Sequence, residues 1–181
     1  MKITETELKG CFIIEPSVFE DERGCFYEAF NKKKLEEALG YQVNFVQDNV
    51  SVSKYGVVRG LHYQEAPFAQ AKLVSVSKGR VQDVVVDLRK ENSTYLKHVS
   101  IELSDVNRKM LFVPKGMAHG FAVLSDEAEF RYKVDEFYHK EAERGMVYNH
   151  PDLAIDWHIE EKDLILSEKD MKLPSTSFKI S

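Results

Sequence analysis

The residues best suited to acid/base chemistry begin in residues 56–79, GVVRGLHYQEAPFAQAKLVSVSKG. This segment has β-strand character, and alternation places His62 and Gln64 on one face of a strand and Arg59 on the other. Lys72 begins the next run, and two neighbouring strands would bring His62, Gln64 and Lys72 together. A histidine that titrates near neutrality can remove a proton, and a lysine can stabilise developing negative charge. These residue types indicate a candidate site for proton transfer.

Later segments add further candidates. His119 precedes an apolar strand in residues 114–124, PKGMAHGFAVL, and the run EFRYKV at residues 129–134 reads as the hairpin partner of that strand. Tyr132 shares a face with apolar residues, so it is either a core tyrosine bonded to a carbonyl or a site residue. Asp170 follows Ser167 in a pattern typical of a capping box, so it either complements a helix N-terminus or reaches a histidine.

The spacing of these residues resembles the two signatures of the cupin superfamily. The first, G-x5-H-x-H-x3-4-E-x6-G, aligns with residues 56–79, and the P-x-G-x2-H of the second aligns with residues 114–119. Where a metal-binding cupin has His, His, Glu and His, this sequence has His62, Gln64, Lys72 and His119. An ammonium group has no acceptor and repels a cation, so Lys72 argues against a metal ion. We therefore expect an acid/base site without a metal or other cofactor.

The rest of the chain predicts a mainly β fold. Strand-like runs occupy residues 11–15, 25–30, 43–52, 81–88, 97–103 and 109–113, and turn signals separate them at short intervals. Residues 78–80, Lys-Gly-Arg, predict a tight turn that pairs the central segment with the run 81–88. Residues 31–40 predict one helix, capped by Asn31 and ended by Gly40. We expect a cupin-type jelly-roll β-sandwich with a few short peripheral helices, as a single domain over residues 1–181.

Composition excludes several classes of protein. A net charge of −5 without a basic stripe argues against nucleic-acid binding, although local Arg and Lys can still hold a small anion. No apolar run reaches the roughly 18 residues of a membrane span, and the N-terminus lacks an apolar signal core. We expect a cytoplasmic protein that does not bind a membrane. Two cysteines do not make a disulfide framework.

Over nearly the whole chain the sequence resembles the dTDP-4-dehydrorhamnose 3,5-epimerases. The resemblance lies in DERGCFYE, QDNVSVSKYGVVRGLHYQ, QAKLVSVSKGRVQDVVVDLRK, VPKGMAHGFAVLSDEAEFRYK, and PDLAIDW followed by LSEKD. Val50 is a departure, because the family often has His after QDN. The resemblance implies a homodimer that uses no metal or nucleotide cofactor and acts on a dTDP-linked 4-keto-6-deoxy sugar. The implied reaction epimerises C3 and C5 of dTDP-4-dehydro-6-deoxy-D-glucose to dTDP-4-dehydro-L-rhamnose, in dTDP-rhamnose biosynthesis.

The resemblance also assigns roles to residues. It implies that His62 is the base, that Asp170 orients it, that Tyr132 is the acid, and that Lys72 stabilises the substrate oxygen. These types suit the chemistry, because inversion beside a ketone needs a base, a cation for the enolate, and an acid on the opposite face. The residues that it assigns to substrate binding are Arg23, Glu28, Gln47, Asp48, Asn49, Arg59, His119, Tyr138, Glu143 and Lys169.

Other functions are compatible with the same residues. An epimerase that acts at one carbon, or a ketoisomerase on a related dTDP-4-keto sugar, would use the same base and enolate, although Tyr132 favours double inversion. In a non-catalytic cupin binding module, the presence of His62, Lys72 and Tyr132 together would be a coincidence. A metal-dependent dioxygenase would need a metal ion, and Lys72 argues against one. We therefore favour the double epimerase.

Overall fold

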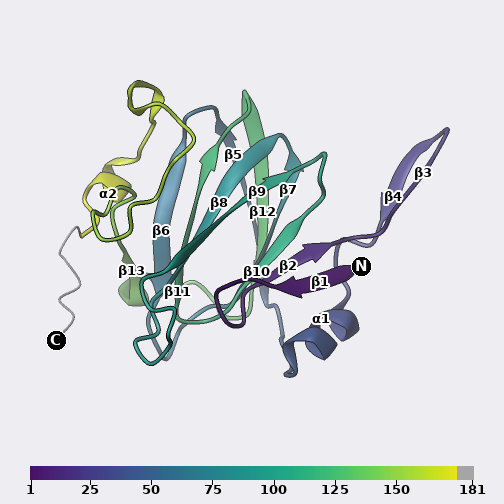
Figure 1. The fold of residues 1–181 in the computed structure, drawn as a ribbon, viewed down its shortest axis with the longest axis horizontal. Coiled ribbons are helices and arrows are strands. Elements are labelled where there is room, and N and C mark those ends of the chain that lie inside the picture. Colours follow the sequence, from purple (N-terminus) through teal and green to yellow (C-terminus); the bar gives the residue numbers. More distant parts are fainter. Residues whose placement is uncertain (175–181) are drawn as a thin grey trace.

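Two antiparallel β-sheets face each other in the computed structural model, which describes residues 1–174 (Figure 1). The six-stranded sheet contains, in spatial order, β1 (Lys2–Glu5), β2 (Phe12–Glu15), β10 (Met110–Val113), β7 (Lys72–Lys78), β12 (Glu127–Val134) and β5 (Gln47–Lys54). The five-stranded sheet contains β13 (Glu143–Gly145), β6 (Val58–Gln64), β11 (Met117–Val123), β8 (Arg80–Asp87) and β9 (His98–Ser104). The predicted mainly β sandwich is confirmed.

Smaller elements surround the sandwich. A separate hairpin, β3 (Val18–Asp21) and β4 (Gly24–Tyr27), projects away from the sheets (Figure 1). Helix α1 (Lys32–Leu39) is capped by Asn31 and ends at Gly40, as predicted. Helix α2 (Glu168–Met171) and two 3-10 turns, Lys140–Ala142 and Glu161–Asp163, complete the short helices. Among residues 1–174, no helix has the length and apolar character to span a membrane.

The chain repeatedly crosses from one sheet to the other, which corrects two predicted pairings. The tight turn at Gly79 joins β7 to β8, but β8 pairs with β11 and β9 in the opposite sheet. Likewise β12 is not the hairpin partner of β11, because β12 pairs with β5 and β7. A short turn between two apolar strands is compatible with a hairpin and with the corner of a sandwich, so the sequence pattern alone did not separate them.

A pair of stacked aromatic rings lies at the boundary between the core and the cavity between the sheets. Phe121 of β11 and Phe130 of β12 stack with ring centroids 4.1 Å apart, and each is at most 5% exposed. Valines and leucines of both sheets, such as Val74 and Val85, fill the space beside them. Burial of a phenylalanine side chain stabilises a fold by roughly 1.5–3 kcal/mol. This packing fixes the two sheets relative to each other, and the candidate site lies against the same two rings.

Candidate active site

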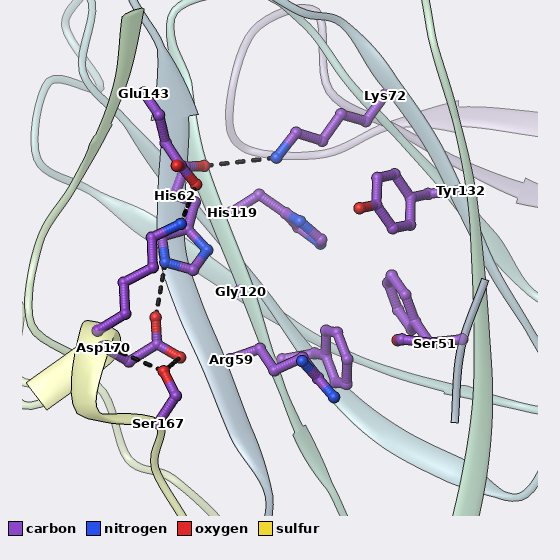
Figure 2. Close-up of a pocket in the computed structure, with 13 residues that line it drawn as sticks. Ser51, Arg59, His62, Lys72, His119, Gly120, Tyr132, Glu143, Ser167 and Asp170 are labelled. Atoms are coloured by element: carbon purple, nitrogen blue, oxygen red, sulfur yellow. Dashed lines mark hydrogen bonds and ion pairs between the residues drawn. The ribbon is translucent and has the colours of Figure 1, made fainter. Parts of the chain in front are cut away.

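A cavity of about 260 Å³ lies between the two sheets (Figure 2). It contains the four predicted catalytic residues and four of the predicted binding residues. Both sheets and the region of α2 contribute to the wall. The lining residues are Ser51, Arg59, His62, Lys72, His119, Gly120, Phe121, Phe130, Tyr132, Glu143, Ser167, Lys169 and Asp170.

An irregularity in β6 places both Arg59 and His62 at this cavity. His119 of β11 lies opposite His62, and Phe121 lies opposite Arg59, so β6 contains one more residue than β11 over this stretch. Gly60 accommodates the irregularity with a φ of +108°, and a Cβ at this position would lie 2.7 Å from the Cα of Gly120. The predicted strict alternation, with Arg59 and His62 on opposite faces, is therefore wrong.

His62 is paired with Asp170, the predicted orienting carboxylate. Their Nε2 and Oδ1 atoms lie 2.7 Å apart, in an ion-pair contact that lacks the alignment of a regular hydrogen bond. Ser167, which caps α2, donates its hydroxyl to Asp170 Oδ2 at 2.9 Å and accepts the Asp170 backbone N–H at 3.0 Å. Burial alone would raise the pKa of Asp170, but the contacts with His62 and Ser167 lower it below its ordinary value. Asp170 thus complements the helix and also reaches the histidine.

Lys72 reaches the cavity from the opposite sheet. Its strand, β7, belongs to the six-stranded sheet, so the prediction that Lys72 lies on a strand beside His62 is wrong. Its Nζ lies 3.4 Å from the carbonyl oxygen of His62. Burial lowers the pKa of Lys72 to about 8, although the nearby charges of Asp83 and Glu143 act in the opposite direction. Among the residues that the structure describes, no three His, Cys, Asp or Glu side chains are grouped as metal ligands.

Tyr132 faces the cavity from β12, across from the pair formed by His62 and Asp170 (Figure 2). Burial raises its pKa above the ordinary tyrosine value, and the charge of Glu143 adds to this effect while that of Arg59 opposes it. The hydroxyl therefore retains its proton at neutral pH. Tyr132 can donate a proton on the side of the cavity opposite to His62.

A second histidine pair lies deeper in the cavity wall. His119 Nε2 lies 2.9 Å from Asp83 Oδ2, and both side chains are buried. Sequence analysis missed Asp83. It lies in the run VQDVVVDL, which also contains Gln82 and Asp87, and no alternating pattern separates Asp83 from these polar neighbours. The pairing with Asp83 restrains the ring of His119, which lines the cavity.

Glu143, Lys169 and Tyr138 form a connected group at the rim. Lys169 Nζ donates to Glu143 Oε1 at 2.6 Å, and the Tyr138 hydroxyl donates to Glu143 Oε2 at 2.8 Å. Burial would raise the pKa of Glu143, but these two hydrogen bonds lower it below its ordinary value. Tyr138 is 52% exposed and does not itself line the cavity. It is connected to the cavity wall by the hydrogen bond to Glu143.

Two predicted binding residues lie far from the cavity. Arg23 is at the tip of the β3–β4 hairpin and pairs with Asp21, and Glu28 follows the hairpin and accepts a hydrogen bond from Lys34 at 2.8 Å. The hairpin and α2 lie at opposite ends of the molecule in Figure 1. Within one chain, Arg23 and Glu28 therefore do not reach the site.

The remaining predicted binding residues lie on β5. In this strand the polar residues Gln47, Asn49, Ser51 and Ser53 face inward, whereas Val50 and Val52 are exposed. Gln47, Asn49, Ser51 and Ser53 alternate along one face, where Ser51 lines the cavity and Ser53 accepts hydrogen bonds from Arg59. Gln47 donates to Asn49 at 2.8 Å. Sequence analysis missed Ser51 and Ser53, although the alternation of VNFVQDNVSV places them in register with Asn49.

The opposite face of β5 carries Asp48 and Val50. Asp48 pairs with Lys133 at 2.8 Å, and Val50 is 57% exposed. Neither Asp48 nor Val50 lines the cavity. Gln47 and Asn49, although they share a face of β5 with Ser51, do not line it either, so only Ser51 of this strand reaches the cavity wall. Val50, where the sequence departs from the family pattern, is therefore not part of this cavity wall.

Proton transfer is the chemistry that this cavity can carry out, since a paired histidine, a buried cation and a protonated tyrosine surround it. Fold and site together define a class of protein, a β-sandwich with a cavity that holds the groups of a general acid/base catalyst.

Comparison with known proteins places the chain within this class. The dTDP-4-dehydrorhamnose 3,5-epimerase family model matches residues 5–177. The dTDP-4-dehydrorhamnose 3,5-epimerase of Shigella flexneri is 50% identical over 171 residues, which cover 94% of this chain and 93% of the relative. The chain therefore belongs to the dTDP-4-dehydrorhamnose 3,5-epimerase family.

Solved structures agree with this assignment. The crystal structure of dTDP-4-dehydrorhamnose 3,5-epimerase from Elizabethkingia anophelis NUHP1 is 57% identical, with a TM-score of 0.93 and coverage of 96% of this chain and 95% of that chain. The Legionella pneumophila dTDP-6-deoxy-D-glucose-3,5-epimerase, in complex with dTDP-4-keto-L-rhamnose, is 48% identical, with a TM-score of 0.89 and coverage of 94% and 89%.

Proposed function

We propose that this protein converts dTDP-4-dehydro-6-deoxy-D-glucose to dTDP-4-dehydro-L-rhamnose by epimerisation at C3 and C5, in dTDP-rhamnose biosynthesis. Family membership supports the reaction, and the single observation that carries it is the placement of His62 and Tyr132 on opposite sides of one cavity (Figure 2). We also propose that residues 1–181 act as one cytoplasmic domain, as the sequence predicts.

His62 is the base in this proposal. Its neutral imidazole removes the proton from the carbon next to the 4-keto group, and the electron pair of the C–H bond moves into the enolate. The imidazolium that results lies 2.7 Å from the ionised Asp170, whose lowered pKa keeps it charged at neutral pH. The ion pair stabilises the positive charge at the moment when it forms.

Lys72 stabilises the enolate oxygen. It is 9% exposed, so its charge acts through a medium of low dielectric constant and is fixed before the reaction begins. Tyr132 then gives its proton to the opposite face of the carbon. The transferred protons balance, because the base gains one, the acid loses one, and exchange with water restores both.

We expect Tyr132→Phe to separate proton removal from inversion. The variant keeps His62, Lys72 and the ring of Tyr132, so it should still exchange substrate hydrogen with solvent, while product formation falls by about 10²-fold for loss of the acid. The measurement is NMR of dTDP-4-dehydro-6-deoxy-D-glucose in D2O with chelator-treated protein, in which deuterium is followed at C3 and C5. Inversion at the wild-type rate would assign the acid to another group.

The same experiment on the wild-type protein tests the function itself. Deuterium entry at both carbons, together with product, is the expected result. Exchange at C3 alone would identify a single-carbon epimerase, and the absence of exchange would leave a binding module.

We further propose a homodimer in which the β3–β4 hairpin of one copy completes the site of the other. The hairpin projects from the sandwich (Figure 1). It exposes two aromatic side chains, since Phe19 is 65% and Phe26 is 70% exposed. Such exposure is typical of an interaction surface. The cavity of about 260 Å³ is smaller than the roughly 300–1,000 Å³ of ligand sites, and a nucleotide sugar needs further walls. A partner would bring Arg23 and Glu28 to the ligand, and the Arg23 guanidinium suits a diphosphate.

This dimer predicts complementation between two inactive variants. Arg23→Ala and His62→Ala, each of low activity, should regain activity when they are mixed under conditions that exchange subunits, because one site of the mixed dimer has both residues. Analytical ultracentrifugation should give the mass of a dimer. A monomer at micromolar concentration, or a mixture no more active than its components, would contradict the arrangement.

A further inference from the structure

Gln64 is a buried amide whose polar atoms are all used. It ends β6, two residues after His62, and is 5% exposed. Its Nε2 donates to the carbonyl oxygens of Phe68, at 2.6 Å, and Phe137, at 3.2 Å. Its Oε1 accepts the backbone N–H of His139 at 2.7 Å. The side chain does not line the cavity, although the cupin signature has a metal-ligating histidine at this position.

Two of these hydrogen bonds flank a single residue, Tyr138. The carbonyl of Phe137 precedes it and the N–H of His139 follows it, so the Gln64 amide pairs with the backbone on both sides, as a neighbouring strand would. The third bond, to Phe68, joins the loop at residues 65–71 to the same point. The ring of Phe68 stacks on the ring of His139 with centroids 3.7 Å apart.

Packing does not fix Tyr138, since its side chain is 52% exposed. Its hydroxyl is held by Glu143, which pairs with Lys169 at the cavity rim. Glu143 in turn lies opposite Gln64 in the pairing of β13 with β6. Tyr138 is therefore held at two points, its backbone by Gln64 and its hydroxyl by Glu143. Gln64 acts directly on the backbone of the loop that carries Tyr138.

We propose that Gln64 is a positioning residue, which holds Tyr138 at the rim so that the aromatic ring and Glu143 form a preorganised wall for the nucleotide part of the substrate. This inference rests on the proposed function for the identity of the ligand. A wall that is already ordered reduces the entropy lost on binding. Gln64 acts on affinity for the nucleotide, whereas the proton transfers depend on His62 and Lys72.

The test is Gln64→Met, which keeps the length of the side chain and removes all three hydrogen bonds. We expect KM for the nucleotide sugar, and the Kd for dTDP measured by calorimetry, to rise about 10-fold or more, because the backbone on both sides of Tyr138 loses the hydrogen bonds that hold it before the ligand binds. We expect kcat to stay within about threefold. Gln70→Met is the matched control, because Gln70 donates to the Glu136 carbonyl of the same loop at 2.7 Å but does not flank Tyr138. It should leave KM within about twofold.

A double-mutant cycle with Tyr138→Ala tests whether Gln64 acts through Tyr138. If it does, Gln64→Met should change the Kd for dTDP much less in the Tyr138→Ala background than in the wild type. Equal effects in both backgrounds would overturn the proposal, as would a folded Gln64→Met protein with unchanged KM and Kd.

Gln64→Glu provides a second variant should the methionine protein fail to fold. Its carboxylate still accepts from His139 but repels the two carbonyls, and protonation restores one donor, so the Kd for dTDP relative to wild type should improve as pH falls from 8 to 6. A ratio independent of pH would contradict the proposal. The Kd measurements need no turnover, so they test Gln64 even if the wild-type protein showed no exchange and the proposed reaction failed.

Discussion

His62→Ala is expected to abolish deuterium exchange at both C3 and C5, with turnover reduced by about 10²–10⁴-fold, the usual contribution of a general base. His62 is the more accessible of the two histidines in the cavity, because its side chain is 25% exposed against 7% for His119, and it lies 2.7 Å from a carboxylate. The fold should remain, since the side chain lies at the cavity and outside the apolar core. The measurements are exchange by NMR and circular dichroism of the same sample.

His98→Ala is the matched control. His98 begins β9 of the same sheet and does not line the cavity, so its removal should leave exchange unchanged. His119 is the main alternative candidate for the base, because it is the other histidine in the cavity and is also paired with an aspartate. Appreciable exchange in His62→Ala, with its loss in His119→Ala, would transfer the role of base to His119.

Lys72→Met should reduce kcat by about 10²–10³-fold, the effect of removing one preorganised group from a developing oxyanion. Because Lys72 is needed in its charged form and its pKa is about 8, wild-type kcat should also fall as pH rises through 8. A Lys72→Met variant with near wild-type kcat would show that another group stabilises the enolate.

The same substitution should stabilise the folded protein. Burial holds the pKa of Lys72 at about 8 in the folded state, below the ordinary value of 10.5, so the folded state disfavours the charge. Below pH 8 this cost is fully present, about 3 kcal/mol at roughly 1.4 kcal/mol per pKa unit. Between pH 8 and 10.5 the unfolded chain binds more protons than the folded chain, so wild-type stability from this group rises with pH. Lys72→Met should therefore gain about 1–3 kcal/mol at pH 7, and the gain should shrink above pH 8.

Urea unfolding of both proteins at several pH values from 7 to 9.5 measures this difference. Lys78→Met on the same strand is the control, because Lys78 is exposed and pairs with Glu127 at the surface. Its effect should stay within about 0.5 kcal/mol. A loss of stability in Lys72→Met at pH 7 would mean that the ammonium group contributes favourable contacts that exceed its burial cost.

Much of the site could be predicted because the sequence patterns that indicate it are short. His62, Lys72 and His119 stand at the spacing of known signatures, and the capping pattern from Ser167 to Asp170 marked a helix start that the structure places beside His62. Strand propensity and turn signals were sufficient for the sandwich. These features depend on residues within about ten positions of one another, where periodicity and turn chemistry are reliable.

What could not be predicted depends on long-range pairing. No local pattern indicates that β7 and β8 enter different sheets, and an extra residue in β6 reverses the expected face of Arg59. Asp83 shares its run with Gln82 and Asp87, and its role arises only when β8 pairs with β11 and brings it to His119. Arg23 is a further case, because its distance from the cavity is a property of the projecting hairpin.

The division of the site between two layers has a stereochemical consequence. His62 belongs to the five-stranded sheet and Tyr132 to the six-stranded sheet, so a flat enolate between them presents one face to each layer. With the roles proposed above, the proton leaves toward one layer and its replacement arrives from the other. Configuration at the carbon is then inverted by the architecture itself, and the Phe121–Phe130 stack, which fixes the spacing of the layers, also fixes the gap across which the two transfers occur. Retention would require base and acid to lie on the same layer.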